Sequence, residues 1–303
     1  MEANLLPALE VKRTKIMRNA LTVDLEDYYH VSAFRQSITE DQWSSQQDRV
    51  ERNTDLLLQW FDEVGCKATF FTLGCVAEQH PRLIRRLAEQ GHEVACHSLR
   101  HRTLYEMSPE EFREDTRRAK KLLEDVSGSA VLGYRAPSFS ITEKSIWAFE
   151  ILAGLGFTYD SSVFPVRHPN YGMPQISRAP FVVDTGAGPI VEFPMPTLEL
   201  AGMRSPLGGG AYLRLLPYWY TRWGIQYLNA YENRPICVYV HPWEIDPDQP
   251  RLKGNMTARL RHTLGLSGLE KKLRNLLEDF EFCPLSVLLD EIGRPETVFA
   301  VRA

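Results

Sequence analysis

Short apolar runs alternate with amphipathic stretches in the first half of the chain, and this alternation restricts the folds available to it. Runs 20–23, 68–73 and 93–96 have the length and the apolar character of buried strands. Stretch 50–64 instead carries apolar side chains at helical spacing and is followed by Gly65, as helices commonly are. A repeated strand–helix unit predicts a parallel sheet covered by helices. In a chain of 303 residues, a barrel is the economical form of such an α/β fold.

The second half of the chain is less regular. Residues 161–235 are rich in proline and contain three consecutive glycines at 208–210, so we expect long loops there rather than a new domain. Runs 190–193 and 236–240 resemble the last strands, and residues 267–279 form an amphipathic pattern typical of a helix.

Polar residues follow the apolar runs at the points where the strands are expected to end. Asp24, His97, Arg135 and Asp160 occupy such positions in the first half, and His241 follows the last run. The carboxyl ends of barrel strands meet at one face, where barrel enzymes assemble their sites. We therefore expect these five side chains to converge.

Carboxylates and histidines in this set favour a metal site. Asp24, Glu26 and Asp27 crowd three negative charges together, which a cation would relieve. His97 and His101, four residues apart, can bind one divalent metal from a helical turn. Each pattern alone also fits a solvated acidic turn or ordinary surface histidines, but together they predict two histidines and one carboxylate as ligands. Glu26 is the favoured carboxylate because an extended strand points it to the same side as Asp24, and Asp27 is the alternative.

Three further residues have both a catalytic and an ordinary interpretation. Arg135, in the segment Gly-Tyr-Arg-Ala-Pro-Ser-Phe, can pair with a carboxylate or lie on the surface of a proline turn. Asp160 can orient a histidine or form an Asx-turn with the serines that follow it. His241 can act as a general acid or be a satisfied core histidine.

Composition excludes several classes of partner. Hydrophobic residues make up 44% of the chain, which is enough for a full core. With 35 Lys and Arg against 39 Asp and Glu, the net charge of -4 gives no broad basic face, so we expect no nucleic-acid partner. The five cysteines are scattered without a CxxC pair, which favours buried reduced thiols. No secretory signal is visible in residues 1–20 and no run is long enough to span a membrane, so the expected compartment is the cytoplasm.

Taken in order, the motifs resemble the polysaccharide deacetylase family (carbohydrate esterase family 4, the NodB homology domain). The order is an aspartate cluster, Lys-Ala-Thr-Phe-Phe at 67–71, His-Ser-x-x-His, Arg-x-Pro, a strand-end aspartate and a late strand-end histidine. The resemblance covers residues 18–245 and implies a deformed, seven-stranded (β/α) barrel. It leaves an N-terminal segment, 1–17, and a C-terminal helical extension, 246–303, packed on the barrel. Details such as His-Pro-Trp-Glu at 241–244 resemble a subgroup that accompanies bacterial exopolysaccharide and exosortase gene clusters.

The resemblance also implies a role for each site residue. Asp24 corresponds to the general base, Arg135 to the arginine that holds the base, and His241 to the general acid. His97 and His101 correspond to the metal-binding histidines. Asp160 corresponds to the aspartate that helps to set the state of the acid.

Two departures from the family pattern affect these assignments. Typical members have two adjacent aspartates, whereas here two residues separate Asp24 from Asp27. The aromatic residue expected three positions after the arginine is Ser138, with Phe139 one position later, so the backbone amide of Ser138 would bind the oxyanion. Residues expected to contact the sugar are Ser138, Phe139, Tyr28 and Trp243.

The expected function is therefore metal-dependent removal of the acetyl group from an N-acetylated sugar in a polysaccharide or its precursor, with release of acetate, in exopolysaccharide biosynthesis. Such an enzyme is a hydrolase of carbon–nitrogen bonds other than peptide bonds, and Zn²⁺ suits its imidazole ligands best. The alternatives are a metal-independent, allantoinase-like amidohydrolase and a non-catalytic glycan-binding protein. The expected partner is an N-acetylated glycan or glycan precursor; the sequence identifies neither the sugar nor whether a homo-oligomer forms.

Overall fold

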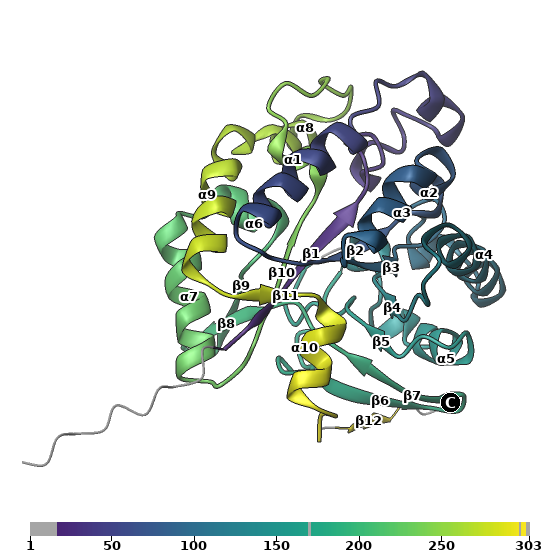
Figure 1. Ribbon diagram of the computed structural model, residues 1–303. Helices are drawn as coiled ribbons and strands as arrows, with labels where there is room; N and C mark the ends of the chain where they lie inside the picture. The colour runs from purple at the N-terminus through teal and green to yellow at the C-terminus, as the bar shows by residue number, and fades with distance from the viewer. Residues whose placement is uncertain (1–16, 169–170, 297, 301–303) are drawn as a thin grey trace, which may run out of the picture.

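The computed structural model describes residues 17–168, 171–296 and 298–300, so all but the last residue of the expected N-terminal segment lies outside the described residues. Within them the main sheet has the order β10–β1–β2–β3–β4–β5–β7–β6–β12, and β11 pairs with β1 (Figure 1). Its strands are β1 (Asn19–Leu25), β2 (Thr69–Thr72), β3 (Glu93–Cys96), β4 (Gly133–Tyr134), β5 (Tyr159–Asp160), β6 (Phe181–Thr185), β7 (Gly188–Glu192), β10 (Cys237–Val240), β11 (Phe282–Cys283) and β12 (Val298–Ala300). Neighbouring strands in the stretch β10–β1–β2–β3–β4–β5–β7 are all parallel. These are the seven parallel strands of the expected barrel.

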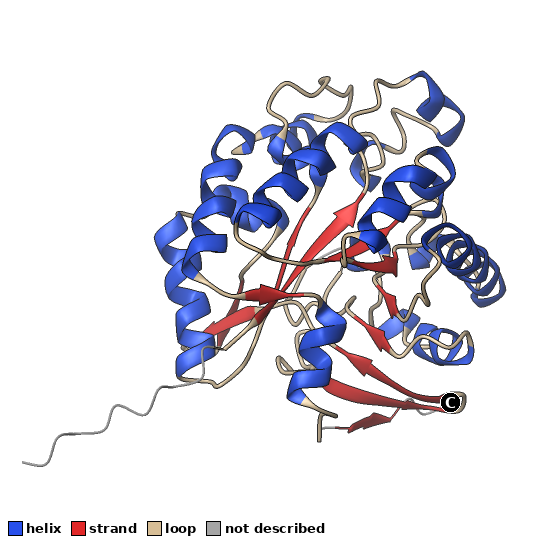
Figure 2. Cartoon of the chain, in the orientation of Figure 1, coloured by secondary structure: helices blue, strands red, loops and turns tan. Residues whose placement is uncertain are grey.

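Helices surround these strands, as Figure 2 shows. They are α1 (Val50–Glu63), α2 (Gly74–Gln79), α3 (Pro81–Glu89), α4 (Pro109–Ser127), α5 (Ala148–Gly154), α6 (Gly210–Leu215), α7 (Tyr218–Ala230), α8 (Met256–Thr263), α9 (Leu266–Asp279) and α10 (Leu285–Ile292). None of the helices in the described residues is long and apolar enough to cross a membrane. The arrangement confirms an α/β fold, a deformed (β/α) barrel with further helices at its C-terminal end. It is incompletely closed, because no pairing between β7 and β10 occurs in the described part of the chain.

Strand β1 lies at the centre of the fold. All its residues are buried, and it pairs on one side with β10 and on the other with β2. Burial along the whole length is typical of a parallel strand that is covered on both faces, and β1 carries the polar residues Asn19, Thr22 and Asp24 within that buried stretch. Because the buried strand continues to Leu25, it carries the carboxylate of Asp24 into the interior, where only 3% of that residue is exposed.

Residues 161–235 correct the expectation of long loops. They contain β6 and β7, the separate antiparallel hairpin of β8 (Thr197–Leu200) and β9 (Met203–Pro206), and the helices α6 and α7. The sequence of α7 does not show which side is buried, because it carries large apolar side chains on both sides. In the structure Trp219 and Trp223 are exposed, whereas Ile225 and Leu228 are buried. Most prolines in the described part of this region lie outside the strands or at their ends, and Pro189, the second residue of β7, pairs with Asp184 in register.

Residues beyond 245 also take part in the main sheet. β11 adds to β1 through the pair Ala20–Cys283, and β12 adds to the outer side of β6. The five cysteines are all buried and free, as expected for reduced thiols.

We predict that Gly133→Ala destabilises the protein. A Cβ atom at position 133 would lie 2.1 Å from Cζ of Tyr159, the residue that pairs with Gly133 across β4 and β5. The Tyr159 ring is buried and its hydroxyl donates a 2.7 Å hydrogen bond to Glu93, so the ring has little room to move. Overpacking of this kind costs about 1–3 kcal/mol, which urea unfolding would measure.

Gly268→Ala is the matched control. This glycine lies inside α9, and a Cβ atom there would meet nothing within 4 Å. Alanine is favoured over glycine inside a helix by about 0.8–1 kcal/mol, so this variant should be more stable than the unmodified protein. Equal stability of the two variants would contradict the packing argument.

Candidate active site

The carboxyl ends of the parallel strands bring the expected side chains together. Asp24 lies in β1 and Glu26 follows it, while His97 follows β3 and His241 follows β10. Nε2 of His241 lies 3.8 Å from Oδ2 of Asp24 and 3.7 Å from Oε1 of Glu26. Residues from opposite ends of the chain therefore share one buried, polar centre.

Glu26, His97 and His101 form a group that could hold a metal ion. Each offers one ligand atom, all three atoms lie within 4.8 Å of one another, and all three residues are buried. Nδ1 of His97 hydrogen bonds to the carbonyl of Arg135 at 2.7 Å, and Nδ1 of His101 contacts Oγ of Ser32 at 3.2 Å. With Nδ1 engaged, each ring keeps Nε2 for a ligand, as metal-binding histidines usually do.

The carboxylate of Glu26 supports a cation at this position. Its Oε2 lies 3.0 Å from Nε2 of His101, yet this buried oxygen has no hydrogen-bond partner among the described residues. Burial alone would raise the pKa of Glu26, but the neighbouring imidazoles, His101 foremost, hold it well below its usual range. An ionised, unsatisfied oxygen between two imidazole nitrogens fits a divalent metal.

The two histidines are positioned by an unusual turn rather than by a helix. Ser98 and His101 have left-handed backbone conformations, with φ of 70° and 53°, and the backbone N–H of His101 donates to Oγ of Ser98. The expectation of a helical turn is therefore wrong, although the rings do meet, with centroids 5.3 Å apart. Positive φ at residues other than glycine is costly and is often found at functional sites.

Asp27, the alternative carboxylate ligand, lies outside the metal group. One of its oxygens accepts the backbone N–H of Tyr28, and the other accepts the N–H groups of Arg49 and Val50. These last two groups belong to the start of α1, where a helix leaves N–H groups without partners. The structure thus places Glu26, the favoured carboxylate, in the metal group, whereas both oxygens of Asp27 accept backbone N–H groups, two of them at the start of α1.

Arg135 is fully buried and holds Asp24, as expected. Its Nη1 donates to Oδ1 of Asp24 at 2.6 Å and to Oγ1 of Thr22 at 2.8 Å. The remaining guanidinium groups bond to the carbonyl and hydroxyl of Ser161, and the guanidinium lies 4.1 Å from the centroid of the Phe71 ring. Every donor is used, so the orientation of the Asp24 carboxylate is fixed.

His241 is oriented by Glu244, a residue that our sequence analysis does not assign to the site. Nδ1 of His241 lies 2.9 Å from Oε2 of Glu244, whose other oxygen accepts a 2.7 Å hydrogen bond from buried Arg214. Burial would lower the pKa of His241, but the charge and hydrogen bond of Glu244, with Glu26 and Asp24, raise it to about 9. The sequence signal is the capping box of His241 and Glu244 around Pro242.

Asp160 does not orient His241 in the described structure. Its oxygens accept the hydroxyl and the backbone N–H of Ser162, which is the Asx-turn that the sequence left open. Asp160 also faces Glu192 in register on β7; burial raises the pKa of both, and the charge of Asp160 raises that of Glu192 further. Ser161, which directly follows Asp160, accepts hydrogen bonds from Arg135 through its carbonyl and its hydroxyl, so Asp160 lies next to a partner of the arginine that binds Asp24.

Ser138 and Phe139 form a second left-handed turn, with φ of 54° and 53°. Oγ of Ser138 contacts Oγ of Ser32, which in turn contacts His101, so the turn lies beside the metal group. The backbone N–H of Ser138 has no acceptor within the described part of the chain and remains available to an oxyanion. Phe139 is 8% exposed and packs against Phe164.

Tyr28 and Trp243 are buried, which changes their expected role as sugar platforms. Tyr28 is completely buried and offers no face to a sugar ring. Trp243 is 5% exposed; its Nε1 donates to Oε1 of Glu26 at 3.1 Å, and its ring stacks on His241. Trp243 therefore orients the ligand carboxylate and the histidine.

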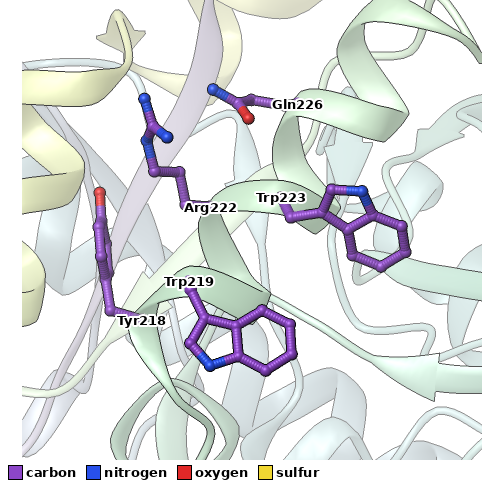
Figure 3. A pocket seen from close by; sticks show the side chains of 5 residues that line it. All are labelled: Tyr218, Trp219, Arg222, Trp223 and Gln226. Carbon is purple, nitrogen blue, oxygen red and sulfur yellow. The ribbon is translucent and has the colours of Figure 1, made fainter.

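An open hollow of 590 Å³ lies on α7 and is lined by Tyr218, Trp219, Arg222, Trp223 and Gln226 (Figure 3). Tyr218 and Arg222 both contact Asp279 at the end of α9, and Trp223 packs on Tyr227. No contact in the described residues joins this hollow to the metal group, so it does not belong to the same site.

We predict that Glu26→Gln weakens Zn²⁺ binding. Loss of a residue that only hydrogen bonds to a metal ligand weakens binding by roughly 10- to 100-fold, and loss of a ligand itself should weaken it by more. Asp27→Asn should retain the metal affinity. It should lower the free energy of unfolding by about 1–3 kcal/mol, since its amide group would face the N–H groups of α1. Competitive titration with a metal indicator and urea unfolding measure the two effects. A larger loss of affinity in Asp27→Asn would reverse the assignment.

Comparison with known proteins agrees with this geometry. A family model described as polysaccharide deacetylase matches residues 38–159, and a second, described as a domain of unknown function (DUF3473), matches residues 161–290. A provisionally assigned polysaccharide deacetylase from Mycobacterium smegmatis has the same fold, with a TM-score of 0.57 and 21% identity over 97% of this chain and 100% of that one.

Curated relatives match a part of the chain. The peptidoglycan-N-acetylglucosamine deacetylase of Bacillus cereus is 32% identical over 98 residues, which are 32% of this chain and 36% of that protein. The chitooligosaccharide deacetylase of a Bradyrhizobium species is 31% identical over 88 residues, 29% of this chain and 40% of that protein. The chain thus spans less than half the length of these relatives. Residues 38–159 of this chain are thus similar to the polysaccharide deacetylase family.

Proposed function

We propose that this protein hydrolyses the acetamide of an N-acetylated sugar in a glycan or glycan precursor and releases acetate. The observation that carries the proposal is the single buried centre in which three metal-binding side chains lie between a carboxylate held by arginine and a histidine held by glutamate. Relatives named as deacetylases of peptidoglycan and of chitooligosaccharide support this chemistry.

Glu26, His97 and His101 would hold a divalent metal, for which Zn²⁺ is the best candidate because two of the three ligands are imidazoles. When bound, such an ion polarises a carbonyl oxygen and lowers the pKa of water. Three protein ligands leave open positions for water and substrate, as hydrolytic metal sites require.

Asp24 is the proposed base. Its Oδ1 is bound to Arg135 and its Oδ2 faces His241, so the carboxylate can take a proton from water on the side of the metal group. The free N–H of Ser138 would stabilise the oxyanion of the tetrahedral intermediate. An amide is a poor electrophile, and these two groups together lower the barrier to attack.

His241 is the proposed acid. Its Nε2 faces the shared centre while Nδ1 is held by Glu244, so the proton on Nε2 can pass to the leaving amine of the sugar. The interaction with Glu244 favours the protonated ring, which is the state that a general acid requires.

The biological setting follows from the same resemblance. We propose that the substrate belongs to exopolysaccharide biosynthesis and that the reaction takes place in the cytoplasm, on a precursor of an exported glycan. We also propose that residues 18–245 form the catalytic barrel and residues 246–303 an extension packed on it.

Asp24→Asn and His241→Ala should each reduce kcat for acetate release by about 10²–10⁴-fold, because each removes a proton-transfer group. Acetate assays on an N-acetylated oligosaccharide would measure this. His80→Ala, at a surface histidine paired with Asp48, is the control and should keep full activity. Since Asp24→Asn leaves the buried Arg135 charge without a partner, circular dichroism must confirm folding at the assay temperature.

Full activity in either variant would refute the proposed roles. Acetate release that persists after exhaustive chelation would instead support a metal-independent amidohydrolase. Tight binding of the glycan without acetate release, across several metals, would support a non-catalytic glycan-binding protein.

Glu244→Gln should move the alkaline limb of the kcat/KM profile to lower pH. The carboxylate of Glu244 raises the pKa of His241, so its loss lets the ring lose its proton at a lower pH. Glu270→Gln, at an exposed partner of Arg274, is the control and should leave the profile in place. A uniform fall in activity with no movement of the limb would show that Glu244 acts only on the local structure.

A further inference from the structure

A pocket of 320 Å³ lies close to the metal group, because the segments that border it also contact the proposed ligands. It lies between α8 and the 3-10 turn η1 (Ser32–Phe34), and its walls include Phe34, Arg251, Arg259 and His262. The catalytic proposal uses none of these four side chains.

One indole separates this pocket from the proposed metal ligands. The ring of Trp243 stacks on His262 with centroids 4.5 Å apart, and its Nε1 donates to Glu26. On the other side, Phe34 packs edge-to-face on His262, and Ser32 of the same turn contacts His101. The pocket and the proposed metal ligands are therefore neighbours, joined through Trp243 and His262 on one side and through η1 on the other.

The pocket carries positive charge that the protein does not neutralise. Arg251 and Arg259 are exposed, and neither forms an ion pair with a carboxylate among the described residues. The segment 249–269, which includes α8, contains no Asp or Glu at all, although the whole chain has a net charge of -4. An isolated basic pocket beside the active centre of an acidic chain indicates an anionic ligand.

His262 adds a hydrogen-bonding group at the base of the pocket. It is 4% exposed, and its Nε2 has no hydrogen-bond partner among the described residues. Burial and the charge of Arg214 lower its pKa to about 4, while a bond to the backbone of Tyr28 engages the ring. A neutral imidazole at the wall of the pocket can accept a hydrogen bond from a hydroxyl, and a buried polar atom of this kind usually has a partner.

We propose that this pocket binds the phosphate group of a phosphorylated N-acetylated sugar, so that the substrate of the active centre is a carrier-linked precursor rather than a neutral polymer. The planar guanidinium groups of Arg251 and Arg259 match phosphate oxygens, and His262 would accept a hydroxyl of the same ligand. This inference rests on the proposed function, because it assigns the substrate class of that site.

The carrier could be a nucleoside or a lipid, and both attach the sugar through phosphate. Met256 and Leu260, also at the pocket, are 66% and 47% exposed, and Leu264 beyond them is 48% exposed. An apolar rim next to a basic pocket suits an isoprenoid chain, and the experiment below includes both carriers.

The test compares an N-acetylhexosamine 1-phosphate with the methyl glycoside of the same sugar. The unmodified protein should favour the phosphorylated substrate in kcat/KM by about tenfold or more, a preference that falls as salt rises. The double variant Arg251→Ala/Arg259→Ala should lose most of this preference, and calorimetry should show weaker binding of the 1-phosphate. Arg82→Ala/Arg85→Ala, which removes from α3 two exposed arginines that form no ion pair among the described residues, is the matched control and should retain both.

The carrier is identified with two further substrates, a nucleoside diphosphate sugar and a short isoprenyl diphosphate sugar. The one that the protein turns over faster carries the natural type of carrier. Equal kcat/KM for the phosphorylated and the neutral sugar, or an equal loss for both in the double variant, would overturn the inference while leaving the deacetylase proposal intact. Binding of the 1-phosphate that depends on the two arginines, without acetate from any substrate, would support the pocket and refute the deacetylase.

Discussion

The buried ion pair between Arg135 and Asp24 is the interaction on which the site depends. Removing a guanidinium from water costs several kcal/mol unless its charge and all its donors are satisfied. Here the partners come from separate segments: Asp24 and Thr22 from β1, Ser161 from the turn after β5, and Cys237 from β10. Since the partners lie on β1, on β10 and in the turn after β5, the guanidinium is satisfied only when these strands are in register. The same interaction thus completes the core and orients the base.

The three neighbouring carboxylates at the end of β1, Asp24, Glu26 and Asp27, each have a different set of partners. Asp24 lies in β1 and binds Arg135, whereas Glu26 follows the strand, its backbone N–H donating to the carbonyl of Asp24, and its side chain joins the metal group. Asp27 lies past the strand and turns toward α1, where it binds backbone N–H groups. Proximity in sequence would suggest mutual repulsion, but each charge has a different set of partners, so the cluster is compatible with a stable fold.

The parallel core and its strand-end residues are predictable from sequence because buried parallel strands are continuous apolar runs with a polar residue at their ends. The structure of residues 161–235 is less predictable from sequence. Helix α7 exposes aromatic side chains, and the two hairpins of this region follow prolines. The pairing of His241 with Glu244 can be inferred only from a capping pattern, which by itself indicates a turn. The choice of Glu26 over Asp27 depends on where the strand ends, and sequence-based boundaries are uncertain by a few residues.

Charge is distributed unevenly about this centre, and the distribution restricts which substrates can bind. Asp24, Glu26 and Glu244 place negative charge in the interior, next to the point where the acetamide must lie. Each of these carboxylates already has a partner in the described structure, Arg135, His101 or Arg214, so the interior offers no unpaired cation to an anionic substrate. Arg251 and Arg259 line a pocket that the stacked rings of Trp243 and His262 separate from Glu26, apart from these carboxylates. This separation lets one substrate present a neutral amide to the interior and an anion to the rim.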